Sequence, residues 1–151
     1  MARADHLRQT IRPALECGQW VISDRFADST RIYQGVLGNV DARLIWRLEK
    51  LTVGETGPDL TIILDIPPEE GLARVARRRG DAPVDRFEAE AFDFHKTLRE
   101  AYLELAEREP NRCVVINAGA DAGTVSEFVW SAVNTRLGPG EAPLMVQGVA
   151  S

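Results

Sequence analysis

One short apolar run constrains the fold of this chain more than any other feature. Between Asp59 and Asp65 the residues read Leu-Thr-Ile-Ile-Leu, and two consecutive prolines stop the run at 67 and 68. A nearly continuous apolar run of this length predicts a strand that is buried on both faces, which is how strands lie in parallel sheets. We therefore expect an α/β fold in which helices cover both faces of a parallel sheet.

The rest of the chain is predicted to alternate between helices and strands. Strands are expected at 19–23, 59–65 and 112–118. Apolar residues at helical spacing predict helices at 3–16, 40–51, 88–108 and 124–137, with one more after the two prolines. In the first helix Pro13 predicts a kink or a break, and Gly18 stands where a left-handed C-cap residue would. Asn39 is the expected N-cap of the second helix.

The segment from 24 to 34 offers chemistry that suits a small phosphorylated ligand. The apolar run from Trp20 gives way at Asp24 to polar residues, as a strand does where its carboxyl end meets a crevice. Arg25 can bind phosphate oxygens bidentately, and Asp24 could hold Mg²⁺ through water or orient the arginine. The side chains that could contact a sugar and a base are Ser29, Thr30, Tyr33 and Gln34. An ordinary strand-end ion pair is the alternative for an isolated Asp24–Arg25 pair.

The order of residues in this segment resembles the deoxynucleoside-monophosphate signature of thymidylate kinases. It reads Asp-Arg-Phe at 24–26, Asp-Ser-Thr at 28–30 and Tyr-Gln-Gly at 33–35. The resemblance runs from about Ala2 to about Leu137. It implies a P-loop NTPase-like, three-layer α/β/α fold with a parallel sheet, and transfer of the ATP γ-phosphoryl group to dTMP with Mg²⁺ as cofactor. It also implies a homodimer that packs through helices of this region, near the apolar residues that form one stripe of the helix predicted at 40–51.

The resemblance assigns particular residues to dTMP. They are Arg3, Asp24, Arg25, Phe26, Ser29, Thr30, Tyr33 and Gln34. Arg3 is included because it stands ten residues before Pro13, as a phosphate-binding arginine does in the family. The alternative for Arg3 is a solvated side chain near the terminus. Asp24 would contact the metal indirectly, through water.

An arginine cluster resembles the lid of these kinases. Four arginines precede the turn-forming residues 80–83, and Asp-Arg-Phe-Glu at 85–88 matches the family motif that follows the lid. The resemblance implies that lid arginines stabilise the transferred phosphoryl group, and the candidates are Arg77, Arg78 and Arg79. Contacts to ATP are expected from Arg74, Arg86, Ala118 and Gly119. A solvated helix face or a polyanion contact is the usual alternative for such a cluster.

The sequence has no match to the phosphate-binding loop Gly-x-x-Gly-x-Gly-Lys-[Ser/Thr]. Its only lysines, Lys50 and Lys96, fall within predicted helices. We therefore expect residues 1–138 to be a nucleoside-monophosphate-kinase domain truncated at its amino end, without the first strand, phosphate loop and first helix, followed by a flexible tail at 139–151. The chain alone is then expected to be inactive, and either marginally stable or associated. Two alternatives stay open: a kinase for another nucleoside monophosphate, and a non-catalytic nucleotide-binding or dimerisation module.

Composition and charge limit which partners the protein is expected to bind and where in the cell it is expected to lie. A formal net charge of -5 argues against nucleic-acid binding, and no apolar run approaches the length of a membrane span. The two cysteines, Cys17 and Cys113, form neither a disulfide framework nor a metal-ligand spacing. We expect a cytoplasmic protein whose ligands are dTMP and ATP.

Overall fold

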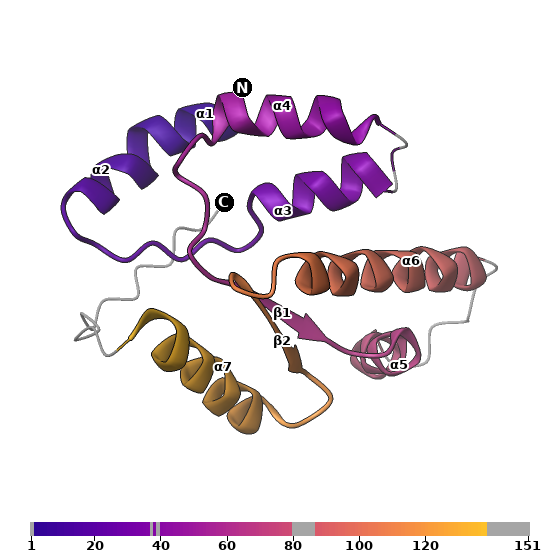
Figure 1. The fold of residues 1–151 in the computed structure, drawn as a ribbon. Coiled ribbons are helices and arrows are strands. Elements are labelled where there is room, and N and C mark those ends of the chain that lie inside the picture. Colours follow the sequence, from indigo (N-terminus) through magenta and orange to yellow (C-terminus); the bar gives the residue numbers. More distant parts are fainter. Residues whose placement is uncertain (1, 37, 39, 80–86, 139–151) are drawn as a thin grey trace.

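The computed structural model describes residues 2–36, 38, 40–79 and 87–138. Arg86, Asn39 and the predicted tail at 139–151 lie outside these ranges. Among these residues, helical segments between Ala2 and Thr52 precede the first strand, two helices separate the strands and one helix follows them. Figure 1 shows helices around a central pair of strands.

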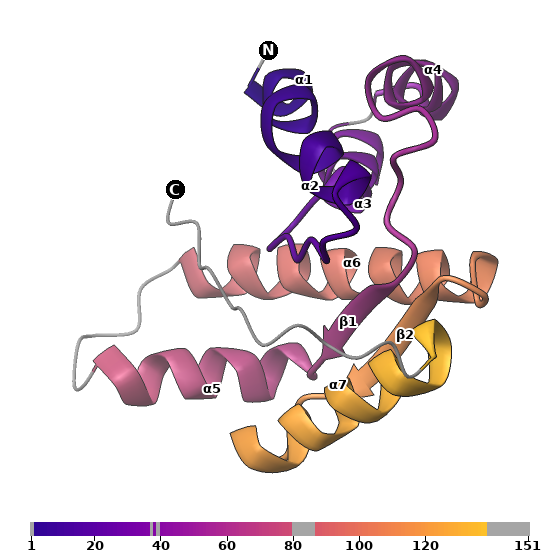
Figure 2. The same cartoon turned by 90° about the vertical axis from the view of Figure 1, so that its left-hand side faces the viewer.

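The two strands form a parallel pair between two helical layers. β1 (Thr61–Asp65) pairs with β2 (Cys113–Asn117), so that Thr61 lies opposite Cys113 and Asp65 opposite Asn117. Helix α6 (Phe87–Arg108) lies on one side of the pair and α7 (Ala122–Leu137) on the other, as Figures 1 and 2 both show. The predicted parallel α/β/α architecture is confirmed.

The strand predicted at 19–23 is wrong. These residues are extended but have no strand pairing, and the side chain of Ile22 is 88% exposed. Within the described part of the chain no strand lies beside them, so their amide and carbonyl groups have no ladder to join. An apolar run becomes a strand only when a neighbouring strand pairs with it.

The first helix is interrupted as predicted, by a π-helical turn that ends just before Pro13. It consists of α1 (Ala2–His6), the π-helical turn η1 (Leu7–Ile11) and α2 (Arg12–Glu16). Proline lacks an amide hydrogen and crowds the carbonyl four residues before it, and the wider π-turn accommodates both effects. The helix ends at Gly18, which has φ 71° and donates its N–H to Leu15 O, while Gln19 donates to Ala14 O. This is a Schellman motif, and it confirms the predicted C-cap.

The segment that follows residues 19–23 is helical, although no helix was predicted between residues 17 and 39. It forms α3 (Ala27–Thr30) and a second π-helical stretch, η2 (Arg31–Val36). The next helix, α4 (Ala42–Thr52), begins at Asp41, whose carboxylate accepts the Arg43 N–H at 2.8 Å. Asp41 and not Asn39 therefore caps this helix, because its side chain is the one that satisfies an end amide.

Two small apolar clusters hold the elements together. The first joins η2, β1, α6 and β2 through buried residues Ile32, Ile63, Ala101, Leu105 and Cys113. The second joins η1, α3 and the end of α4 through Leu7, Ile11, Ala27 and Val53. Helix α5 (Pro68–Arg79) begins at the second proline and packs beside α6, as Figure 2 shows. Arg74 of this helix donates to the carbonyl of Ala118, which directly follows β2.

Candidate functional site

Arg25 is the most unusual residue of the predicted ligand segment. Its backbone has φ 64°, in the left-handed region that residues other than glycine rarely adopt. Its exposed guanidinium lies over the Tyr33 ring, with 4.5 Å between the guanidinium carbon and the ring centroid. Backbone strain of this kind costs about 1–3 kcal/mol and occurs mainly at functional sites. The fold therefore holds an exposed cation in a defined place.

The other predicted dTMP-binding side chains lie on α3, on η2 and before them. Asp24 and Gln34 are exposed, whereas Phe26 packs against the second apolar cluster. The Ser29 hydroxyl shares a hydrogen bond of 3.0 Å with the Tyr102 hydroxyl of α6. Tyr33 is half-buried beside Phe94, with 6.3 Å between the ring centroids. Tyr33 and Gln34 thus lie on η2, and Arg25 lies in the bend that precedes α3.

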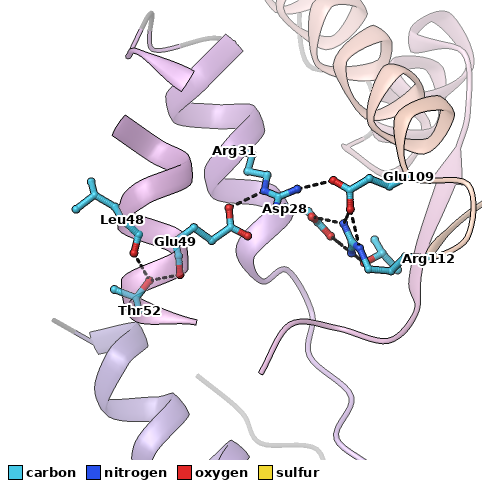
Figure 3. Close-up of polar contacts among 8 residues, drawn as sticks. Asp28, Arg31, Leu48, Glu49, Thr52, Glu109 and Arg112 are labelled. Carbon is cyan, nitrogen blue, oxygen red and sulfur yellow. Dashed lines mark hydrogen bonds and ion pairs between the residues drawn. The ribbon is translucent and has the colours of Figure 1, made fainter. Parts of the chain in front are cut away.

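An ion-pair network lies at the base of the same stretch, and sequence reasoning missed it. Asp28 is 6% exposed and accepts both terminal nitrogens of Arg112, each at 2.8 Å. Thr61 donates to the same carboxylate at 2.8 Å. Arg31 donates to Glu49 and to Glu109, each at 2.6 Å (Figure 3). The network joins α3 and η2 to α4 and to the amino ends of both strands.

The charges in this network stabilise one another. Burial alone would raise the pKa of Asp28, but hydrogen bonds from Arg112 and Thr61 and the charge of Arg112 outweigh burial and lower it. The hydrogen bond to Glu49 raises the pKa of Arg31, although its partial burial acts in the opposite direction. Asp28 and Arg31 are therefore held in their charged forms.

The carboxyl ends of the strands carry a second group of predicted residues. Arg74 of α5 donates from Nη1 to Ala118 O at 2.9 Å and from Nη2 to Gly119 O at 2.7 Å. Arg74 and Gly119 border an open hollow of about 530 Å³, which is also lined by Glu69, Glu70, Arg77 and Asp121. Ligands of open α/β sheets bind at this edge. The structure therefore brings Arg74 into contact with Ala118 and Gly119 and places Arg77 on the same hollow.

An ion pair joins α6 to the same edge of the sheet. Arg99 donates from Nε to Asp65 Oδ1 at 2.6 Å and from Nη2 to Asp65 Oδ2 at 2.9 Å. The hydrogen bond from Arg99 lowers the pKa of Asp65, against a smaller opposing effect of burial. The pair fixes α6 against the end of β1.

Several predicted site residues have only a backbone placement or none. Arg78 and Arg79 belong to the last turn of α5, and Arg3 belongs to α1. Arg86 lies outside the described residues. Their assigned roles stay predictions.

The described ranges contain neither a metal centre nor a helix that could span a membrane. No three side chains of His, Cys, Asp or Glu in these ranges gather closely enough to hold a metal ion. None of the described helices is long and apolar enough to cross a bilayer.

The missed residues gave little signal in the sequence. Asp28 stands inside the recognised motif, but its partner Arg112 is 84 residues away and no spacing rule connects them. Tyr102 and Arg99 occupy ordinary helical positions in α6. A charged residue directly before a buried strand, as Arg112 is, was the one local hint that a strand-end ion pair would form.

Known proteins resemble this chain over most of its length. The sequence model of the family described as thymidylate kinase matches residues 1–129. The thymidylate kinase of Rhodopseudomonas palustris is 54% identical over 136 residues, which cover 90% of this chain and 59% of the relative. The thymidylate kinase of Bradyrhizobium diazoefficiens is 54% identical over 144 residues, which cover 95% of this chain and 63% of the relative.

The fold, like the sequence, is similar to that of a thymidylate kinase. The crystal structure of thymidylate kinase from Ehrlichia chaffeensis superposes with a TM-score of 0.66 at 28% identity, and the match covers 87% of this chain and 58% of that chain. The chain thus spans about three fifths of the length of the relatives it matches. Family sequence, fold and the motif at 24–35 agree, and the chain belongs to the thymidylate kinase family.

Proposed function

We propose that this chain forms part of an enzyme that transfers the γ-phosphoryl group of ATP to dTMP, giving dTDP for dTTP synthesis. The observation that carries the proposal is Arg25, whose exposed guanidinium lies over Tyr33 on a left-handed backbone inside the family motif. A fixed guanidinium can hold a phosphate through paired hydrogen bonds. A backbone under strain is retained where a fixed side chain is needed.

dTMP would be bound mainly by the stretch from Asp24 to Gln34. Arg25, with Arg3 of α1, would hold its phosphate. Ser29, Thr30, Tyr33 and Gln34 would contact the sugar and the base, with Ser29 oriented by its hydrogen bond to Tyr102. Reaction then requires the anionic dTMP oxygen to be aligned with the ATP γ-phosphorus, so positioning and charge stabilisation are the main tasks of the protein. No general base is needed.

ATP would lie at the carboxyl edge beside α5. The hollow there combines Arg74 and Arg77 with the carboxylates of Glu69, Glu70 and Asp121. This mixture of charges suits a neutral purine ring better than a triphosphate, and the ring could contact Ala118 and Gly119. The phosphates would then extend toward Arg77, Arg78, Arg79 and Arg86. Mg²⁺ supplies charge neutralisation on the phosphates, and the exposed carboxylate of Asp24 is a suitable acceptor for its water ligands.

The sheet offers a place for a further strand. Within the described residues β1 pairs on one side only, with β2, and its Leu64 side chain is 55% exposed. The extended run at 20–23 exposes Ile22 in a similar way. We place the phosphate-loop strand of the complete enzyme between β1 and this run, where it would pair with both and bury their apolar side chains.

A homodimer and a cytoplasmic location complete the proposal. Helix α4 exposes Leu44, Leu48 and Leu51 along one side, which is a suitable face for a second copy. The apolar stripe of 40–51 is therefore assigned to the dimer contact, with only Ile45 buried within the chain. Cys17 and Cys113 are both free thiols in the structure, which suits the reducing cytoplasm.

The test is an assay of phosphoryl transfer in a completed enzyme. The chain would be joined to the amino-terminal segment of the Rhodopseudomonas palustris relative and supplied with ATP, Mg²⁺ and one nucleoside monophosphate at a time. The proposal predicts dTDP formation with dTMP as the best acceptor, and loss of this activity in Arg25→Ala. Faster turnover of another monophosphate would support the related-kinase alternative. Binding of dTMP without turnover would support the non-catalytic module.

A further inference from the structure

The stretch from Ala27 to Val36 carries Ser29, Thr30, Tyr33 and Gln34 of the proposed dTMP site but belongs to no sheet. It follows an extended, exposed run, and among the described residues no strand pairs with that run. Figure 1 shows α3 alongside α6, with the strands on the other side of α6. Side-chain contacts must therefore fix the place of this stretch on the rest of the molecule.

Asp28 fixes the start of the stretch to the amino ends of both strands. Its two carboxylate oxygens each accept a terminal nitrogen of Arg112 at 2.8 Å, and Thr61 donates to Oδ2 at the same distance. Thr61 is the first residue of β1, and Arg112 directly precedes β2. The side chains of Asp28 and Arg112 are 9% and 20% exposed, so solvent screens this pair only weakly.

Arg31 continues the network one helical turn later. It donates from Nε to Glu49 of α4 and from Nη1 to Glu109, and Glu109 also accepts from Arg112. Figure 3 shows the resulting row of charges, from Glu49 through Arg31 and Glu109 to Arg112 and Asp28. The guanidiniums of Arg31 and Arg112 therefore link α3 and η2 to α4, to the end of α6 and to the amino ends of the strands.

The Arg112 guanidinium has no N–H group left to donate to a ligand. Its guanidinium makes five hydrogen bonds, to Asp28 twice, to Glu109 twice and to Thr61 once. A guanidinium has five N–H groups, so all of them are used inside the protein. The network also lies at the amino ends of the strands, opposite the edge where Arg74 meets Ala118 and Gly119.

We infer that Arg112 and Arg31 are positioning residues for the dTMP-binding stretch, holding α3 and η2 on the β1–β2 unit so that Arg25 and Tyr33 keep their geometry. The inference rests on the proposed function where it concerns dTMP, but the positioning itself can be measured without any ligand. Neither arginine is expected to touch the substrate.

The ligand-free test is hydrogen–deuterium exchange on the full chain. Arg112→Met, which keeps an unbranched apolar stem but removes the guanidinium, should speed exchange of the amides of 27–36 about tenfold, while β1 and β2 stay within about twofold of the unaltered chain. Arg31→Met is the milder variant, because Arg31 lies further from the strands, and it should show the same local pattern at smaller amplitude. The matched control is Arg108→Met, which removes an exposed ion pair of α6 and should change neither region.

Two exchange results would overturn the inference. Equal acceleration in 27–36, β1 and β2 would mean that the network stabilises the whole fold without positioning this stretch. Unchanged exchange in 27–36 in both variants would mean that other contacts hold it.

The link to dTMP is tested separately in the completed enzyme. Arg112→Met should raise KM for dTMP about tenfold and leave KM for ATP nearly unchanged, because only the dTMP-binding stretch is displaced. Equal changes in both KM values would contradict positioning. If the unaltered enzyme does not use dTMP, the proposed function fails, and the exchange data still decide the positioning inference.

Discussion

Asp28 illustrates at the level of one residue how a buried charge can link folding to pH. Its pKa lies below the ordinary value of 3.8, because the hydrogen bonds and charge supplied by its partners outweigh the cost of burial. A carboxyl group of this kind binds its proton less readily in the folded chain than in the unfolded chain. It therefore contributes stability above pH 3.8, and that contribution is lost as the pH falls through the lower folded pKa.

Asp28→Asn should consequently lower the free energy of unfolding at pH 6 by about 2–4 kcal/mol, somewhat less than the loss on breaking a fully buried ion pair. The variant should also lose less stability than the unaltered chain between pH 6 and pH 3. Urea unfolding at several pH values measures both effects. Asp5→Asn is the control, since the Asp5–Arg8 pair is exposed and should contribute little. Parallel pH curves for Asp28→Asn and the unaltered chain would contradict this role.

Residue types and their order predicted part of the site before the fold was known. Arg25 could be identified from its motif, and Arg74, Ala118 and Gly119 from family resemblance, and the fold brings the last three into contact. The Asp28–Arg112 pair could not be predicted, because it depends on how α3 packs against the starts of two strands. The strained φ of Arg25 was equally invisible in the sequence.

At the level of elements, the end of α2 depends on the left-handed backbone of one residue, Gly18. Gly18 has φ 71°, and no atom lies within 4 Å of the place where a Cβ would stand. Gly18→Ala would therefore meet only backbone strain and should destabilise the chain by about 1–2 kcal/mol. Gly57→Ala is the matched control, because Gly57 has equally open surroundings without a positive φ. Thermal unfolding compares the two, and an equal effect of both substitutions would contradict the assignment of strain to Gly18.

The last turn of α5 gives an element-level prediction about catalysis. Arg77, Arg78 and Arg79 form the last turn of this helix. Replacing all three with alanine in the completed enzyme should lower kcat more than it alters the affinity for dTMP, because lid arginines act on the transferred group. Steady-state kinetics with dTMP varied at saturating ATP makes the comparison. A rise in KM for dTMP with unchanged kcat would contradict the lid assignment.

Helices were predicted better than strands, for a physical reason. The periodicity of a helix and its caps are local, so the helices near 88–108 and 124–137 and the cap at Gly18 could be placed from the sequence. A strand also needs a partner, which the run at 19–23 does not have among the described residues. The π-turn η2 was missed because the motif residues in it resemble those of a polar loop.

At the level of the whole molecule, much apolar surface is exposed. Leu64 and Val115 on the strands and Phe128 and Trp130 on α7 are all at least 40% exposed, and α4 presents its three leucines to solvent. Such surfaces favour association with a further strand or a second copy. The fold therefore has the features expected of one part of a larger assembly.

The proposed homodimer gives a prediction at this scale. Leu48→Glu with Leu51→Glu should convert a dimer into a monomer, because two charges cannot be buried against a second apolar face without large cost. Stability of the monomer should change little, since both side chains are already exposed. Analytical ultracentrifugation measures the mass, with Val75→Glu on α5 as an exposed apolar control. An unchanged mass in the double variant would place the contact elsewhere.

The central claim is that Arg25 and its stretch form a dTMP site, and a titration of dTMP into the chain, followed by amide chemical shifts in NMR, tests it most directly. The account predicts saturable shifts concentrated in residues 24–36 and much weaker binding of thymidine, which lacks the phosphate. It also predicts that Arg25→Ala loses about 2–4 kcal/mol of dTMP binding free energy, the scale of a lost charged partner. Shifts that spare this stretch, or undiminished binding in Arg25→Ala, would contradict it.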